Sequence, residues 1–260
     1  MNRKKSGCSS LCLILALVIA GAGLWRLWKT MEVPEAGEYA AADRAIVAFA
    51  EENGLSLGDY PEELRALLER NPETEEFVLH YPLDRDKTID VDLSAYSHTD
   101  GVPLFLQWDR QWGCMEYGGK PAALTGCGPV CLSMAAYYLT GDEAFSPDTM
   151  IEFAKKGGYY SPGSGSSWTL ISQGGVELGF DVTELPLVKK RILDNLEAGN
   201  PIICAMGQGD FTSSGHFIVL VGVEDGLLRV NDPNSIERSG KLWAFEDIED
   251  QFRNLWVIRK

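Results

Sequence analysis

The sequence has 260 residues, of which 45% are hydrophobic and 23% are charged. A chain of this length and composition holds one substantial core with appendages and is too apolar for an intrinsically disordered protein. Its formal charge of −15, from 38 acidic and 23 basic residues, argues against nucleic acid as a partner, because phosphate contacts need a basic surface. Six cysteines are too sparse for a disulfide scaffold. Histidine chemistry must use one of three residues, His80, His98 and His216.

The first zone, residues 1–31, contains five basic and no acidic residues, and residues 6–25 carry no charge. Twenty uncharged residues in a helix that rises ~1.5 Å per residue span ~30 Å, which is the hydrocarbon thickness of a bilayer. Because positions 3–5 are basic, the positive-inside bias predicts a single-pass transmembrane helix with a cytoplasmic N-terminus and the following residues outside the cell. The membrane is therefore an expected partner. The alternative is a signal peptide cleaved near residues 20–22 and a secreted protein.

The second zone, residues 32–99, is strongly acidic. Across residues 32–100 there are 18 acidic and five basic side chains. Apolar residues recur at helical spacing over residues 39–53, and two shorter helices are expected to begin near Tyr60 and Asn71. We interpret this zone as a short helical spacer whose carboxylates face solvent.

The third zone, residues 100–260, changes from helical to strand patterns along the chain. Helical spacing and capping residues predict four helices, over residues 128–139, 146–156, 168–178 and 187–198. Runs rich in Ile, Val, Leu and Trp predict four strands, over residues 201–205, 216–223, 227–230 and 255–258. Helices followed by an antiparallel sheet indicate the α+β class.

A cysteine stands at the start of the first of these helices, in Thr125-Gly126-Cys127-Gly128-Pro129. Backbone N–H groups and the positive end of the helix dipole favour the thiolate form at such a position. We expect Gly126 and Gly128 to leave room for a substrate backbone beside the sulfur. For this motif alone, a structural cysteine on a buried turn is the alternative.

A histidine and an aspartate lie near one end of a predicted hairpin. His216 opens an apolar strand, Asp225-Gly226 is a strong hairpin turn, and Asp232 follows the next strand. Folding the chain about this turn places Asp232 about two residues, or ~7 Å, from His216 along the strands. A carboxylate there can accept from the imidazole and hold its tautomer, although Asn231 and Asn234 are alternatives. A histidine satisfied within the core is the alternative reading of this strand alone.

An oxyanion donor is the remaining part of this chemistry. Gln107 lies 20 residues before Cys127, and its side-chain amide is a candidate donor beside the Cys127 N–H. Gln111 is an alternative by spacing. With Cys127 as nucleophile, His216 as base and Asp232 as orienting group, the set has the composition of a nucleophilic acyl-transfer site.

Across residues 102–260 the chain resembles bacterial cysteine peptidases of family thirty-nine, and more closely their stand-alone C-thirty-nine-like relatives. The resemblance is carried by four motifs in this order: Gln107-Trp108-Asp109, Gly126-Cys127-Gly128-Pro129, Gly215-His216-Phe217-Ile218-Val219 and Asn231-Asp232-Pro233. It implies a papain-like fold with Cys127 as nucleophile, His216 as general base and acid, Asp232 as orienting residue and Gln107 as oxyanion donor. The better-known members remove double-glycine leaders within exporters, and we do not expect export-coupled leader removal here.

The sequence thus predicts a membrane-anchored cysteine peptidase that hydrolyses peptide bonds of a peptide or protein substrate outside the cytoplasm. Its parts are an anchor (1–31), an acidic helical spacer (32–99) and a papain-like peptidase domain (100–260). No cofactor is expected, and no metal, because the Cys and His residues lack zinc-ligand spacing. The alternatives are a thiol acyltransferase or amidase with the same triad, and a non-catalytic module that binds peptides or cell-wall material.

Overall fold

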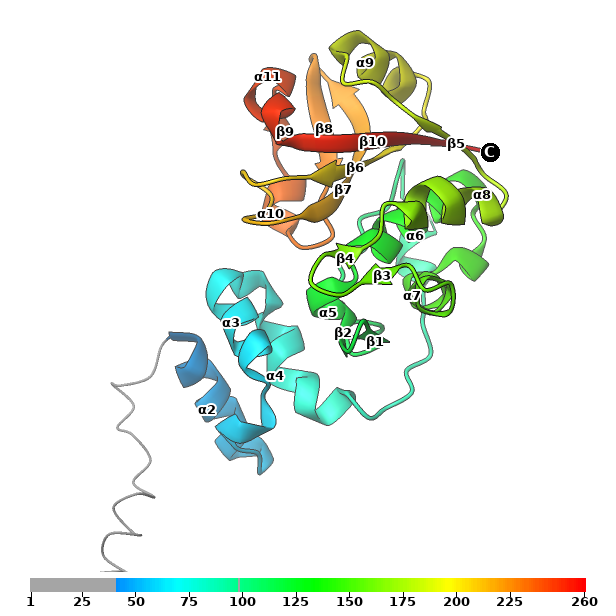
Figure 1. Cartoon of the computed structure of the whole chain (residues 1–260). Helices are drawn as coiled ribbons and strands as arrows, with labels where there is room; N and C mark the ends of the chain where they lie inside the picture. Colours follow the sequence, from blue (N-terminus) through cyan, green and yellow to red (C-terminus); the bar gives the residue numbers. More distant parts are fainter. Residues whose placement is uncertain (1–40, 98) are drawn as a thin grey trace, which may run out of the picture.

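The computed structural model describes residues 41–97 and 99–260 (Figure 1). The predicted transmembrane helix over residues 6–25 lies outside these described residues. Across the part of the chain that is described, no helix combines the length and the apolar character needed to cross a bilayer.

Three helices form the N-terminal part: α2 (Ala41–Asn53), α3 (Glu62–Arg70) and α4 (Glu75–Asp84). They confirm the predicted helical character of this zone, and short 3-10 turns lie between and after them, η1 (Leu57–Asp59), η2 (Pro72–Thr74) and η3 (Ser94–Tyr96). Their apolar faces form one buried cluster that also includes Trp108 and Ala123. The helices therefore pack directly against the start of the following domain.

The next part is mostly helical and contains two small hairpins. Its helices are α5 (Ala122–Thr125), α6 (Cys127–Thr140), η4 (Glu143–Phe145), α7 (Pro147–Lys156), the π-helix η5 (Leu170–Gly174) and α8 (Gly175–Glu177). The hairpins pair β1 (Glu116–Tyr117) with β2 (Lys120–Pro121) and β3 (Tyr160–Ser161) with β4 (Gly165–Ser166). The α-helix predicted over residues 168–178 is instead this π-helix and one α turn. The change falls at two adjacent glycines, which are poor helix formers.

A six-stranded antiparallel sheet forms the C-terminal part, with strand order β5-β10-β6-β7-β8-β9. The strands are β5 (Asp181–Glu184), β6 (Ile202–Met206), β7 (His216–Glu224), β8 (Leu227–Asn231), β9 (Leu242–Trp243) and β10 (Phe252–Arg259). The remaining helices are α9 (Lys189–Glu197), α10 (Ile236–Ser239), α11 (Phe245–Ile248) and η6 (Glu249–Gln251). The predicted α+β class and the four predicted strands are confirmed.

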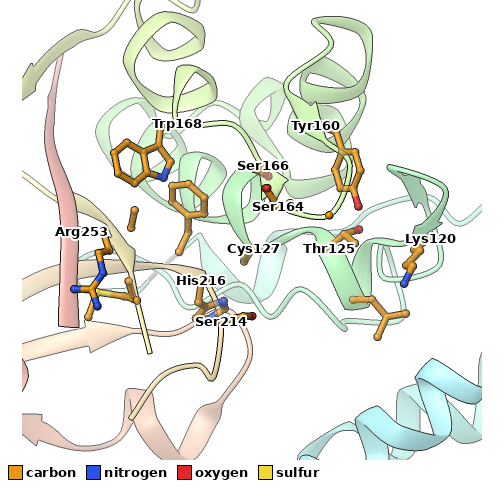
Figure 2. Close-up of a pocket in the computed structure, with 18 of the residues that line it drawn as sticks. Lys120, Thr125, Cys127, Tyr160, Ser164, Ser166, Trp168, Ser214, His216 and Arg253 are labelled. Atoms are coloured by element: carbon orange, nitrogen blue, oxygen red, sulfur yellow. The ribbon is translucent and has the colours of Figure 1, made fainter. Parts of the chain in front are cut away.

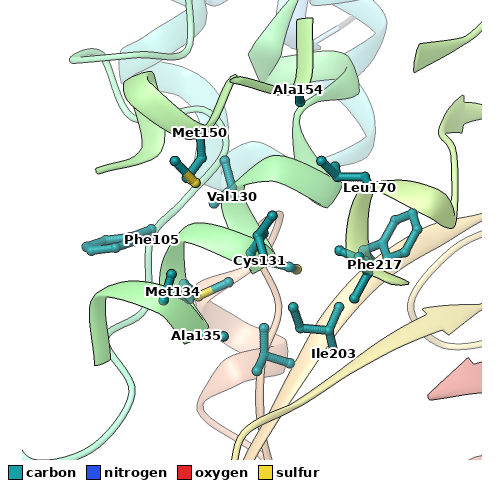
Figure 3. Packing of buried hydrophobic residues seen from close by; sticks show 14 of the residues in the cluster. Phe105, Val130, Cys131, Met134, Ala135, Met150, Ala154, Leu170, Ile203 and Phe217 are labelled. Carbon is teal, nitrogen blue, oxygen red and sulfur yellow. The ribbon is translucent and has the colours of Figure 1, made fainter. Parts of the chain in front are cut away.

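Both faces of the central strand β6 are buried, so its alternate residues enter two different cores. Ile203 and Ala205 of β6 pack in the cluster that surrounds α6, which Figure 3 shows around Cys131 and Met134. Their neighbours Ile202 and Cys204 face the opposite cluster, under α9 and α11. Helix α6 is nearly continuously apolar because most of its residues are buried. Its packing in this cluster holds the start of the helix close to the sheet.

Candidate active site

A cavity of about 710 Å³ opens beside the start of α6 and the adjoining ends of β6 and β7. Cys127 and His216 both line it, and Figure 2 shows them at its centre. Trp168 also lines the cavity and is 48% exposed. The structure thus brings together a thiol and an imidazole that lie 89 positions apart in the sequence.

Cys127 is the first residue of helix α6. Helix α5 ends at Thr125, Gly126 interrupts the helix, and α6 begins at Cys127. The first N–H groups of a helix have no partner within it, so this N–H is available to a ligand. The expectation that the flanking glycines make room for substrate is corrected. A Cβ on Gly126 would lie 2.7 Å from the Ala122 carbonyl oxygen, so this glycine serves the close turn.

Gly128 likewise serves packing within the protein. A Cβ at this position would lie 2.5 Å from Oγ of Ser166, which belongs to β4. The loop that carries β4 therefore lies directly over the first turn of α6. Ser166 is itself held by the Tyr117 hydroxyl, 3.0 Å from its Oγ. This contact positions one wall of the cavity beside the thiol.

His216 and Asp232 form a direct hydrogen bond. Nε2 of His216 donates to Oδ1 of Asp232 at 2.7 Å, and Asp232 is completely buried. The hairpin predicted around Asp225 is present, with Glu224 paired to Leu227 and a positive φ at Asp225. Because Nε2 is engaged by the carboxylate, Nδ1 is the imidazole nitrogen left to exchange a proton with the thiol.

Electrostatics favour the charged forms of both members of this pair. Burial lowers the pKa of His216, but the charge and hydrogen bond of Asp232, together with those of Cys127, outweigh burial and raise that pKa from 6.5 to about 10. Burial raises the pKa of Asp232, but His216 and Arg238 more than offset this and lower it below its ordinary value. The imidazolium form is therefore favoured at neutral pH, which suits a thiolate–imidazolium pair.

Arg238 is a residue of the candidate site that the sequence analysis missed. Its Nε donates to Oδ2 of Asp232 at 2.5 Å, so the carboxylate is held on one oxygen by His216 and on the other by Arg238. Oγ of Ser239 accepts from the Asp232 N–H at 2.8 Å, which fixes the backbone of the same residue. An arginine six residues after a candidate aspartate, in a short helix, carries no distinctive signal in a single sequence.

The two candidate oxyanion glutamines lie in different surroundings. Gln107 is buried, and its Nε2 donates to the carbonyl oxygen of Ala123 at 2.7 Å. Ala123 lies four residues before Cys127. In a continuous α-helix its carbonyl oxygen would accept a hydrogen bond from the Cys127 N–H. Gln107 is not among the side chains that line the cavity, so its direct contact with an oxyanion stays a prediction. Gln111 makes a different contact, because its Oε1 accepts from the Asp92 N–H at 2.7 Å.

Three further cysteines lie in the described residues, Cys114, Cys131 and Cys204. Cys131 points into the core and Cys204 lies within buried β6, and burial raises the pKa of both thiols well above the ordinary value. Burial also raises the pKa of Cys114 to about 11. Within residues 41–97 and 99–260, no three His, Cys, Asp or Glu side chains gather as metal ligands would. Cys127 is thus the thiol that combines exposure to the cavity with an imidazole neighbour.

The family of the chain follows from a match to a family model. Residues 99–260 match the model described as the Peptidase_C39 like family. The chain belongs to this family. The match covers the whole of the helical and sheet parts that hold Cys127, His216 and Asp232. None of the curated proteins matches the chain.

Solved structures of C39 peptidase domains resemble the chain at low identity. The peptidase domain of Streptococcus ComA, a bifunctional ABC transporter involved in quorum sensing, is 20% identical, with 52% of this chain and 91% of that chain covered and a TM-score of 0.40. The corresponding domain of Streptococcus mutans ComA, in complex with a small-molecule inhibitor, is 16% identical, with coverages of 61% and 99% and a TM-score of 0.39. A Bacillus anthracis chain assigned to the C39-like peptidases is 13% identical, with coverages of 62% and 98% and a TM-score of 0.41.

Proposed function

We propose that this chain is a cysteine peptidase anchored in the cell membrane by residues 6–25, with its peptidase domain outside the cytoplasm. The observation that carries the proposed chemistry is the 2.7 Å contact between His216 and Asp232 in a cavity that also exposes Cys127. Family membership and the charge-favouring environment of His216 support the same assignment. The anchor is supported by the charge pattern of the sequence alone.

The proposed reaction begins with attack of the Cys127 thiolate on the carbonyl carbon of a peptide bond. The Cys127 N–H at the start of α6 donates to the developing oxyanion, and the Gln107 amide is the second candidate donor. His216 gives its Nδ1 proton to the leaving amine, which departs and leaves an acyl-enzyme. His216 then takes a proton from water, and the resulting attack releases the acid and regenerates the thiolate. Asp232, itself held by Arg238, keeps the imidazole in the required orientation through both steps.

A comparison of protein termini tests this proposal in cells. Newly formed N-termini are identified by mass spectrometry in cells that make the wild type and in cells that make Cys127→Ala. We expect a set of extracytoplasmic termini that depends on Cys127. Identical sets of termini would contradict the peptidase function. Adding a free amine to the purified reaction separates hydrolysis, which yields only the acid, from acyl transfer, which yields an amide.

Membrane attachment has its own test. The full chain should sediment with membranes after an alkaline wash, and a variant without residues 1–31 should not. Protease added to intact cells should degrade the peptidase domain if it lies outside the cytoplasm. Complete release of the full chain by the alkaline wash would contradict the anchor.

A further inference from the structure

Arg253 stands at a β-bulge on the rim of the cavity. Phe252 pairs with Met206 and Asn254 pairs with Ala205, so Arg253 is the extra residue of β10 opposite β6. Bulges beside active sites redirect a side chain out of the regular strand alternation. Arg253 lines the cavity together with Cys127, and Figure 2 shows it on the same side of that thiol as Trp168.

The backbone alone holds the Arg253 side chain in place. Nη1 donates to the carbonyl oxygens of Asp250 at 2.7 Å and Phe252 at 3.1 Å. The guanidinium also lies against Gly207, where a Cβ would come within 2.3 Å of Nε. Gly207 is in turn tied to η6, since its N–H donates to the Gln251 carbonyl oxygen at 2.7 Å. These contacts orient the guanidinium through Nη1 while Arg253 stays exposed to solvent.

No carboxylate in residues 41–97 or 99–260 forms an ion pair with this guanidinium, although acidic residues outnumber basic ones in the chain. By contrast, Arg259 at the other end of β10 pairs with Asp181 at 3.2 Å. Among the described residues that line the cavity, the only carboxylate is that of Glu63, which pairs with Lys120 at 3.6 Å. Nε and Nη2 of Arg253 thus form an unused donor edge, the geometry that binds a carboxylate through two parallel hydrogen bonds.

Apolar groups line the same cavity as this donor edge. Trp168, Met206 and Phe217 line the same cavity, and the Trp168 ring is 48% exposed. The ring rests against Trp256 of the sheet with centroids 5.8 Å apart, so its exposed side is held at the cavity. A short apolar stem that ends in a carboxylate fits both features, because the stem contacts the ring while the acid meets the guanidinium.

We infer that the part of the cavity bounded by Arg253 and Trp168 is a subsite for an acidic side chain, Glu or Asp, of the peptide substrate. The inference rests on the proposed peptidase function and names its substrate class as peptides with an acidic residue close to the cleaved bond. It also gives Arg253 the role of a specificity determinant, without any part in bond cleavage.

A peptide library tests the inference on both sides of the cleaved bond. The purified full chain is incubated with a chymotryptic digest of a bacterial proteome, which keeps both acidic and basic residues at internal positions, and cleavage sites are identified by mass spectrometry. At one position near the cut, Glu and Asp together should exceed Gln and Asn by about three- to tenfold relative to the library, as expected for one partly exposed charge-assisted pair. Arg253→Gln should abolish that preference, and Arg253→Glu should replace it with a preference for Lys and Arg.

Two controls separate the inference from the function on which it rests. Lys120→Gln removes a cation from the opposite side of the cavity and should leave the preference at that position unchanged. The rate of iodoacetamide alkylation at Cys127 should be the same in Arg253→Gln as in the wild type, which shows that the site is intact. An acidic preference that is absent, or that persists in Arg253→Gln, overturns the inference while cleavage remains. If no cleavage depends on Cys127, the peptidase function fails, and the subsite fails with it.

Discussion

The side chain of Gln107 caps the carbonyl oxygen of Ala123, the residue four positions before Cys127. In an unbroken helix this carbonyl would accept the Cys127 N–H. The cap and the interruption at Gly126 together leave that N–H unpaired at the start of α6. Gln107 thus supports the proposed oxyanion donor, the Cys127 N–H, without itself contacting a substrate.

Replacing Gln107 should therefore damage the chemical step. We expect Gln107→Ala to lower kcat by about 10²- to 10³-fold, with a smaller effect on KM, which is typical for loss of an oxyanion donor. Gln111→Ala is the matched control, because Gln111 contacts the Asp92 N–H instead. Steady-state kinetics on a cleaved peptide measure both values. A wild-type kcat in Gln107→Ala would contradict this role.

Removing the carboxylate of Asp232 should cost both stability and activity. Asp232→Ala leaves His216 and Arg238 without their buried partner, and loss of one member of a buried ion pair costs about 3–5 kcal/mol. Asp232→Asn keeps an acceptor for Nε2 of His216, so we expect it to retain more activity and more stability than Asp232→Ala. Urea unfolding and peptide hydrolysis measure the two effects. Equal behaviour of the two variants would show that the hydrogen bond to His216 has no role.

The pKa of His216 predicts how stability depends on pH. Its value in the folded protein is about 10, above the ordinary 6.5, so the folded state binds the proton more tightly than the unfolded state. The resulting stabilisation is complete below about pH 6.5 and is lost as the pH rises toward about 10. The free energy of unfolding of the wild type minus that of His216→Gln should therefore decrease across this interval. Urea unfolding at several pH values measures it, and a constant difference would contradict the charged pair.

The N-terminal part should support Asp232 through the short helix that carries Arg238. Glu73 in η2 accepts from the N–H groups of Ile236 and Glu237, so it caps the short helix that carries Arg238. We expect Glu73→Ala to destabilise the protein by about 1 kcal/mol, as for loss of a helix cap, and to reduce kcat through a less ordered Arg238. Thermal unfolding and kinetics provide the readouts.

The control for Glu73 is Glu75→Ala, an exposed carboxylate in the first turn of α4. This variant should behave as the wild type in both measurements. If Glu73→Ala and Glu75→Ala are indistinguishable, the N-terminal helices do not support the site through this contact.

Elements with strong local signals could be predicted from the sequence. Helix α6 has Pro129 in its first turn and Gly141 just past its end, and the Asp225-Gly226 turn sets the pairing of β7 with β8. That pairing also brings Asp232 near His216. The position of Cys127 at a helix start and the proximity of His216 and Asp232 could therefore be predicted from local capping and turn residues.

Features that depend on tertiary contacts could not be predicted in the same way. The Asn71 side chain donates to the Asn234 carbonyl oxygen at 2.6 Å, although the two residues are 163 positions apart. No local sequence pattern predicts such a contact. Zone 32–99 accordingly resembled a spacer, although its helices pack on the peptidase part. Arg253 is directed into the cavity by a bulge, and Arg238 is placed by a helix of four residues. Both depend on backbone irregularities that composition and periodicity do not encode.

The central claim is that Cys127 and His216 form an activated pair, and alkylation of Cys127 tests it most directly. The rate of iodoacetamide labelling at Cys127 is followed by mass spectrometry near neutral pH in the wild type and in His216→Ala. Loss of the imidazolium partner should slow labelling by about tenfold or more, because the thiolate is the reactive form. Buried Cys131 should stay unlabelled in both proteins. Equal rates at Cys127 in the two proteins would contradict the account.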